Sequence, residues 1–173
     1  MEIGVLGNVG FLVEGWSDIA QREFFKFIQM PSLTRFLKSL PYDFSVQLTY
    51  LGQKALSAQD AISMEEASVY FVREVSLMLD AIEVVRARSS CLVSSVYWCQ
   101  FLDCGVQPLG EKLFDIQTVS RSALRFGLIS KEHNLIKTYE VIDNAIFRQS
   151  TLTVGYENLI LTECFLPSIR QFL

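Results

Sequence analysis

Hydrophobic and polar residues alternate with a period of two along several stretches of this chain. From Phe44 to Tyr50, the even positions hold Phe, Val, Leu and Tyr, whereas the odd positions hold Ser, Gln and Thr. Because successive side chains of a β-strand point to opposite faces of the sheet, this alternation predicts a strand with one buried face.

Two further pairs of hydrophobic stretches, each pair flanking a short turn-forming sequence, predict β-hairpins. These pairs are residues 65–79 and 82–93 around Asp80-Ala81, and residues 148–154 and 159–165 around Gly155-Tyr156-Glu157-Asn158. Residues 122–129 are compatible with a strand or a helix, and we expect a strand. Hairpin-linked strands of this kind form an antiparallel sheet.

Helical spacing marks the first part of the chain and one short segment in its middle. A helix is expected from Ser17 to Met30, where hydrophobic residues recur at helical intervals. Pro31 begins a second short helix that ends before Pro41, and a third is expected over residues 110–114. Helices followed by hairpins predict an α+β fold, with a single antiparallel sheet and the helices gathered on one face or at one end.

Two of the predicted strands carry a charged residue on their hydrophobic face. Within residues 69–77, Arg73 lies at an odd position, as do the hydrophobic residues of the buried face. Within residues 159–165, Glu163 likewise lies at an odd position together with hydrophobic residues. Burial of an ion is costly unless another group pairs with it. Arg73 and Glu163 are therefore expected either to pair with each other or to face a polar ligand in a pocket, and both alternatives stay open at this point.

The composition is that of a folded protein of one domain, expected over residues 1–173. Half of the residues are hydrophobic, one fifth are charged, and the net charge is −4. The chain has no run of lysine and arginine, which argues against nucleic acid as a partner. A few inward arginines can still create a positive pocket for a small anion in an acidic protein.

The mean hydropathy is positive, at +0.29, which raises the question of a membrane segment. The longest uncharged stretch, residues 89–102, is too short to span a bilayer. The amino terminus lacks the basic region of a signal peptide. We therefore expect a soluble intracellular protein with no membrane partner.

Residues of the kinds that bind metals or act as nucleophiles are few and widely spaced. The four cysteines form no C-x-x-C pair, and His133 is the single histidine, so neither a zinc site nor a cysteine–histidine nucleophile is expected. The chain also lacks the glycine-rich motifs of nucleotide-binding proteins and the motif of serine hydrolases. An enzyme built from this chain is expected to use no metal and no cofactor.

Four short segments follow one another in an order seen in one family of enzymes. They are Ser32-Leu33-Thr34-Arg35-Phe36, Tyr70-Phe71-Val72-Arg73-Glu74-Val75, Gln107-Pro108-Leu109-Gly110 with Leu113-Phe114, and Leu161-Thr162-Glu163-Cys164-Phe165-Leu166-Pro167. In this order they resemble an early helix, an arginine-bearing strand, a T-P-L-G turn and the last strand of the chorismate pyruvate-lyases. The branch that the chain resembles most is that of the short cyanobacterial lyases and the similar chloroplast-encoded reading frames of red algae.

The resemblance implies a fold, a reaction and a location. The family fold is a single antiparallel sheet with helical flaps that cover a buried ligand cavity, and a related fold binds effectors in some bacterial transcription regulators. These lyases convert chorismate to 4-hydroxybenzoate and pyruvate without a cofactor, for quinone (ubiquinone or plastoquinone) or other aromatic biosynthesis. The implied location is the cytoplasm of a bacterium, or the plastid stroma for a chloroplast-encoded protein.

The resemblance also implies roles for four residues. Arg73 would bind the ring carboxylate of chorismate through paired hydrogen bonds, helped by the backbone N–H of Leu109. Glu163 would face the other end of the ring and act in proton transfer or in stabilising the leaving group. Leu33 would pack on the ligand from a flap.

Arg88 and Arg148 also match arginines of the family, whereas residues 131–144 differ from it in length and charge. Two other interpretations stay open on the sequence alone. A domain of the same fold could bind a small aromatic acid without catalysing a reaction. Alternatively, Arg73 and Glu163 could form a purely structural ion pair.

Overall fold

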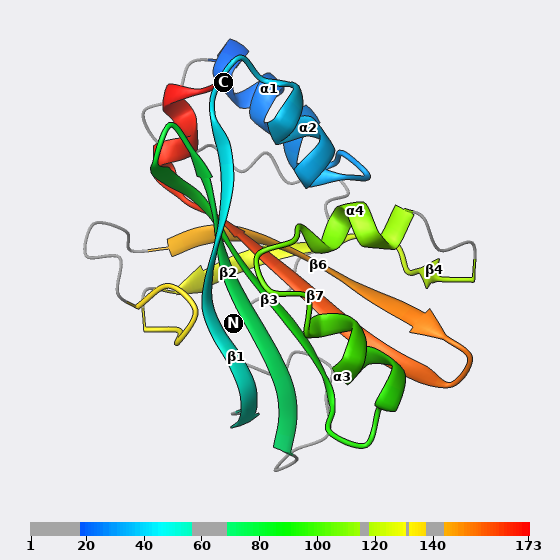
Figure 1. The fold of residues 1–173 in the computed structure, drawn as a ribbon. Coiled ribbons are helices and arrows are strands. Elements are labelled where there is room, and N and C mark those ends of the chain that lie inside the picture. The colour runs from blue at the N-terminus through cyan, green and yellow to red at the C-terminus, as the bar shows by residue number, and fades with distance from the viewer. Residues whose placement is uncertain (1–17, 57–68, 115–117, 131, 138–143) are drawn as a thin grey trace.

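The computed structural model describes residues 18–56, 69–114, 118–130, 132–137 and 144–173 (Figure 1). The strands are β1 (Phe44–Ala55), β2 (Val69–Leu79), β3 (Ile82–Leu92), β4 (Ser120–Arg121), β5 (Arg125–Ser130), β6 (Asn144–Val154) and β7 (Glu157–Phe165). The helices are α1 (Asp18–Ile28), α2 (Leu33–Ser39), α3 (Val96–Leu102), α4 (Leu109–Phe114) and the 3-10 helix η1 (Pro167–Gln171).

The strands of the described residues form one antiparallel sheet in the order β1-β2-β3-β7-β6-β4 (Figure 1). β5 also pairs with β6, so that β4 and β5 share the outer edge of that strand. The expected α+β class with a single antiparallel sheet is therefore confirmed.

The first predicted hairpin is confirmed. β2 and β3 are joined by Asp80 and Ala81, whose φ angles of 46° and 62° are typical of a type I′ turn. This turn follows the natural twist of the two strands, and their register shifts once beyond it, between Met78 and Leu77 of β2. The beginning of the predicted strand, residues 65–68, lies outside the described residues.

The second hairpin has a shorter turn than the sequence suggested. Gly155 and Tyr156 alone join β6 to β7, and the left-handed φ of Gly155, 58°, suits a residue without a Cβ atom. The expected turn of four residues was wrong. The shorter turn changes the register of the hairpin by two residues and places Arg148 directly opposite Glu163.

The two predicted amino-terminal helices are confirmed as α1 and α2, and both lie with η1 at the end of the sheet where β2 turns into β3 (Figure 1). Ser32 is the N-cap of α2, because its side chain accepts a hydrogen bond of 3.3 Å from the backbone N–H of Arg35. The short helix and the strand expected later in the chain correspond to α4 and β5. Among the helices of the described residues, none is both long and hydrophobic enough to cross a bilayer.

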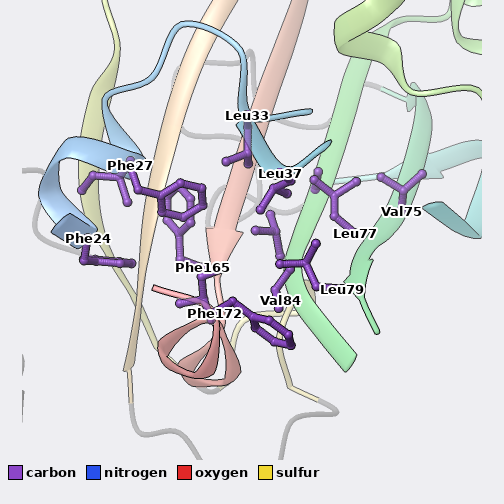
Figure 2. Packing of buried hydrophobic residues seen from close by; sticks show 14 residues of the cluster. Phe24, Phe27, Leu33, Leu37, Val75, Leu77, Leu79, Val84, Phe165 and Phe172 are labelled. Atoms are coloured by element: carbon purple, nitrogen blue, oxygen red, sulfur yellow. The ribbon is translucent and has the colours of Figure 1, made fainter. Parts of the chain in front are cut away.

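A hydrophobic cluster joins these helices to the sheet (Figure 2). Phe24 and Phe27 of α1 contact Phe165 of β7 edge to face, with ring centroids 5.8 and 5.3 Å apart. Leu33 and Leu37 of α2 are buried in the same cluster. This packing fixes the position of α2 relative to the face of the sheet that carries Glu163.

Candidate functional site

Arg73 and Glu163 lie on the same face of the sheet. Arg73 pairs with Ser89 across β2 and β3, and Ser89 pairs with Leu161, two residues before Glu163 on β7. Cross-strand partners share a face, and so do residues two apart on one strand. Since only β3 separates β2 from β7, the two strands lie about 10 Å apart.

A cavity of about 380 Å³ lies on this face of the sheet. Side chains of the central strands line one side of it, and residues at the beginning of α2 and α4 line the other. Leu33, Arg73, Leu109 and Glu163, which the sequence analysis singled out, all line this cavity. Its size and its mostly hydrophobic lining are typical of sites for small molecules.

Arg73 is buried in the wall of the cavity, with 2% of its surface exposed. Its Nη2 atom donates to the backbone carbonyls of Gly105 and Gln107, at 2.9 and 3.0 Å, which fastens the segment before α4 to β2. Its Nε atom is buried and has no hydrogen-bond partner in the part of the chain that the structure describes. Burial lowers the pKa of the Arg73 guanidinium. A desolvated cation with an unused donor is suited to bind an anionic ligand.

Glu163 is paired with Arg148, and the alternative in which it pairs with Arg73 is wrong. Arg148 Nε donates to Glu163 Oε2 at 2.5 Å, and Nη2 donates to Oε1 at 3.2 Å. Only 7% of Glu163 and 1% of Arg148 are exposed. The cause is the register, because Arg148 lies directly opposite Glu163 on the adjacent strand.

Arg148 also anchors the segment that enters α2. Its Nη1 atom donates to the carbonyls of Ile28 and Met30, at 2.9 and 2.7 Å, at the carboxyl end of α1. All three nitrogen atoms of its guanidinium are therefore occupied. Arg148 holds the Glu163 carboxylate in place and ties it to the helices.

Arg121 is a third arginine of the cavity, and it was not predicted from the sequence. Its Nε donates to Ser150 Oγ at 2.9 Å, its Nη1 donates to the Pro31 carbonyl at 2.6 Å, and its Nη2 lies 3.9 Å from Glu163 Oε2. Burial is the main reason that its pKa is lowered; the charge of Glu163 opposes this shift and that of Arg148 adds to it. The described residues of the cavity lining thus include three arginines and one glutamate, in a chain whose net charge is −4.

The helices α2 and α4 approach each other closely beside the cavity. A Cβ atom on Gly110 would lie 3.0 Å from Thr34 Oγ1, so glycine permits this approach. An ion pair between Lys38 and Glu111 joins the same two helices. Leu109, the first residue of α4, lines the cavity, and its backbone N–H has no carbonyl partner within the helix.

Arg88, the other arginine matched to the family, lies on the opposite face of the sheet. Its Nε donates to Glu74 at 2.8 Å, and Glu74 also accepts from Lys54 at 3.2 Å. Arg88 is therefore separated from the cavity by the sheet itself. Of the two additional arginines, only Arg148 lines the cavity.

The cysteines and the histidine do not form a nucleophilic site among the described residues. Burial raises the pKa of the Cys164 thiol to about 12 and also raises that of Cys91, so both thiols stay protonated at neutral pH. His133 is buried, and its Nδ1 accepts a hydrogen bond of 3.1 Å from the backbone N–H of Leu135. None of these residues is among the described residues that line the cavity.

A sequence model described as "Chorismate lyase" matches residues 23–172. The chain belongs to the chorismate lyase family. A probable chorismate pyruvate-lyase of Ralstonia nicotianae is 31% identical to it over 156 residues, which cover 82% of this chain and 79% of that protein. A probable chorismate pyruvate-lyase 1 of Burkholderia pseudomallei is 28% identical over 166 residues, covering 88% and 90%. The resemblance to the chorismate lyase family is confirmed, whereas the narrower assignment to its cyanobacterial and red-algal branch stays a prediction.

Solved structures similar to this member of the chorismate lyase family include domains of transcription regulators. The C-terminal domain of the histidine utilization repressor from Pseudomonas syringae pv. tomato str. DC3000 has a TM-score of 0.55 and 13% identity, covering 73% of this chain and 93% of that chain. The effector domain of PhnF from Mycobacterium smegmatis has a TM-score of 0.55 and 7% identity, covering 79% and 89%. At these identities the likeness concerns the fold alone.

Proposed function

We propose that this protein is a lyase that eliminates pyruvate from chorismate to give 4-hydroxybenzoate, without a metal or cofactor. The observation that carries this proposal is the placement of Arg73 and Glu163 on one cavity wall, on strands about 10 Å apart. Extended from such positions, the two side chains can reach opposite ends of a six-membered ring. Membership of the chorismate lyase family supports the same reaction.

The ring carboxylate of chorismate would bind to Arg73. Its buried Nε atom supplies a charge-assisted hydrogen bond, which is stronger than a neutral one. The backbone N–H of Leu109 would donate to the same carboxylate from the start of α4. Leu33, held by the hydrophobic cluster under α2, would pack against the ring. Glu163 would face the opposite end.

The reaction breaks one ether bond and removes one ring proton. The bond between the ring carbon and the ether oxygen breaks. Its electron pair stays on the oxygen, which leaves with the enolpyruvyl group. The adjacent ring carbon, which carries the hydroxyl group, releases a proton, and the C–H electron pair completes the aromatic ring. Enolpyruvate then takes up a proton and becomes pyruvate. Glu163 would take the ring proton, and its two hydrogen bonds to Arg148, which fix the orientation of the carboxylate, support this role.

Formation of an aromatic product favours the reaction, so the site has a limited task. It must orient the substrate, exclude water and stabilise the charge that develops as the ether bond breaks. The mostly hydrophobic lining, with Arg73 and Glu163 among its charged residues, supports this proposal.

The direct test is to incubate the purified protein with chorismate and to quantify 4-hydroxybenzoate and pyruvate together. We expect equal amounts of both, a loss of activity in Arg73→Ala, and full activity in Arg125→Ala, which changes an exposed arginine of β5. Absence of both products in the wild-type protein would contradict the proposal. Tight binding of 4-hydroxybenzoate without turnover would indicate a domain that only binds aromatic acids.

We further propose that one chorismate lyase domain spans residues 1–173 and that its product enters quinone or other aromatic biosynthesis. The relatives described above are bacterial proteins, which supports a cytoplasmic location; a plastid location follows only from the predicted algal branch. No nucleic-acid or membrane partner is part of the proposal. Restored quinone synthesis in a bacterium lacking its own chorismate lyase would support this role, and failure of an active protein to restore it would contradict it.

A further inference from the structure

Among the residues that the structure describes, the arginines near Glu163 carry more positive charge than Glu163 can balance. Arg148 and Arg121 both lie beside this single carboxylate. Each guanidinium nitrogen of Arg148 already makes at least one hydrogen bond, to Glu163 or to a carbonyl of the chain. Of these two arginines, Arg121 is the one with a whole guanidinium nitrogen that makes no hydrogen bond to the described residues, and this nitrogen can bind a ligand.

Arg121 is held in one orientation with one nitrogen left over. Ser150 and the carbonyl of Pro31 accept its Nε and Nη1 hydrogen bonds, on two sides of the guanidinium. Its Nη2 is 3.9 Å from Glu163, which is too long for a hydrogen bond. Nη2 makes no hydrogen bond to the residues that the structure describes, the side chain is 29% exposed, and Arg121 lines the cavity. The geometry is that of a fixed donor beside Glu163.

We propose that Arg121 binds the carboxylate of the enolpyruvyl group, so that the site recognises a dianion through one arginine at each end. This inference rests on the proposed function. Glu163 faces the ring carbon that loses its proton, and the adjacent carbon carries the ether that breaks. The second carboxylate lies two bonds beyond that ether oxygen, next to Glu163, where the Nη2 atom of Arg121 is located.

This role distinguishes the substrate from the aromatic product. The product 4-hydroxybenzoate keeps the carboxylate that Arg73 binds but lacks the one that Arg121 binds. Arg121 would also stabilise negative charge on the departing enolpyruvate as the ether bond breaks. Loss of Arg121 should therefore impair binding and turnover of chorismate much more than binding of 4-hydroxybenzoate.

The test uses two stable ligands that differ only in the second carboxylate, 3-(carboxymethoxy)benzoate and 3-methoxybenzoate. Their dissociation constants are measured by titration calorimetry with the wild-type protein, Arg121→Gln, Arg121→Lys and the control Arg125→Gln. We expect the wild type to prefer the dicarboxylate by about 10-fold or more, because a hydrogen bond between charged groups contributes this much. Arg121→Gln should lose this preference while binding 3-methoxybenzoate as before, and Arg121→Lys should keep part of it.

The inference would be overturned if Arg121→Gln bound both ligands more weakly by the same factor. It would also be overturned if this variant still preferred the dicarboxylate as the wild type does. Thermal melting of each variant shows whether the fold is retained. If Arg121→Gln unfolds, Arg121→Lys replaces it in the test, because lysine keeps the positive charge. The proposed function is tested separately by turnover of chorismate. The wild-type protein could fail to convert chorismate while its preference for the dicarboxylate still depends on Arg121. That result would contradict the proposed lyase activity but would support the dianion site.

Discussion

Arg148 and Glu163 lie directly opposite each other on β6 and β7 and are joined by two hydrogen bonds, of 2.5 and 3.2 Å. Both side chains are almost completely buried, and Arg148 also binds the carboxyl end of α1. Removal of one partner from a buried ion pair leaves an uncompensated charge, whereas removal of both can be neutral for stability. Single and double variants of the pair can therefore separate its contribution to stability from its contribution to catalysis.

The first prediction concerns the removal of this pair. Arg148→Met should lower the free energy of unfolding by about 3–5 kcal/mol, because Glu163 then remains buried without its hydrogen-bonded partner, and Arg121 is 3.9 Å away. The double variant Arg148→Met/Glu163→Leu should recover much of this stability but should not form 4-hydroxybenzoate. Urea denaturation and the chorismate assay measure the two quantities. A double variant that retains turnover would show that the pair is only structural.

The second prediction concerns Glu163 as the group that transfers the proton. Glu163→Gln keeps the size of the side chain and an oxygen for Arg148, but it removes the basic carboxylate. The turnover number should fall about 100-fold or more, whereas the dissociation constant of 4-hydroxybenzoate should change much less. Glu23→Gln, an exposed change on α1, is the matched control. Unchanged turnover in purified Glu163→Gln would refute this role.

The burial of Arg73 and Glu163 on one face could be predicted from the sequence, because the period of two within each strand is a local property. The partner of Glu163 could not. With the expected turn of four residues, Glu163 would lie opposite Ser150, whereas the observed turn places it opposite Arg148. The two registers differ by two residues and keep the same residues on the same face, so the hydrophobic pattern does not distinguish them.

Helix α3 shows a second limit of the sequence pattern. The aromatic residues Tyr97 and Trp98 are common in strands, and no helix was expected there. In the structure, Trp98 Nε1 donates to the carbonyl of Glu157 at 3.0 Å, and the backbone N–H of Tyr97 donates to the Glu157 carboxylate at 3.1 Å. Both contacts are made with Glu157 at the start of β7, which is distant in the sequence. The local sequence around Tyr97 therefore does not reveal them. Arg121 was missed for a related reason, since β4 is too short for an alternating pattern.

The third prediction concerns metal ions. The chain has one histidine and no C-x-x-C pair, so it lacks the spacing of common metal sites. Incubation with excess EDTA, followed by removal of the chelator, should therefore leave the rate of chorismate turnover unchanged. Loss of activity that a divalent metal restores would contradict this prediction.

The fourth prediction concerns the dependence of stability on pH. Burial raises the pKa of Cys164 from 9.0 to about 12, so the folded protein keeps this thiol proton where the unfolded chain loses it. The contribution of this thiol is present below pH 9 and is lost as the pH rises from 9 toward 12. Wild-type stability should fall more steeply in this range than that of Cys164→Ala. The control Cys104→Ala should follow the wild type, and parallel curves for all three proteins would contradict the prediction.

The fifth prediction concerns the close contact of α2 and α4 beside the cavity. In Gly110→Ala, the new methyl group would lie 3.0 Å from Thr34 Oγ1. Thr34 is buried and β-branched, so it has little freedom to move away. Helix α4 should shift instead and carry Leu109 with it, which should raise the dissociation constant of 4-hydroxybenzoate about 10-fold.

The matched test of this contact is the double variant Gly110→Ala/Thr34→Ala. Truncation of Thr34 removes the atom that the new methyl group meets, so the double variant should bind 4-hydroxybenzoate nearly as tightly as Thr34→Ala alone. Unfolding stability is a poor measure here, because alanine favours a helix over glycine by about 1 kcal/mol and can mask the strain. Tight binding by Gly110→Ala itself, or no recovery in the double variant, would show that the approach of the two helices does not set the shape of the site.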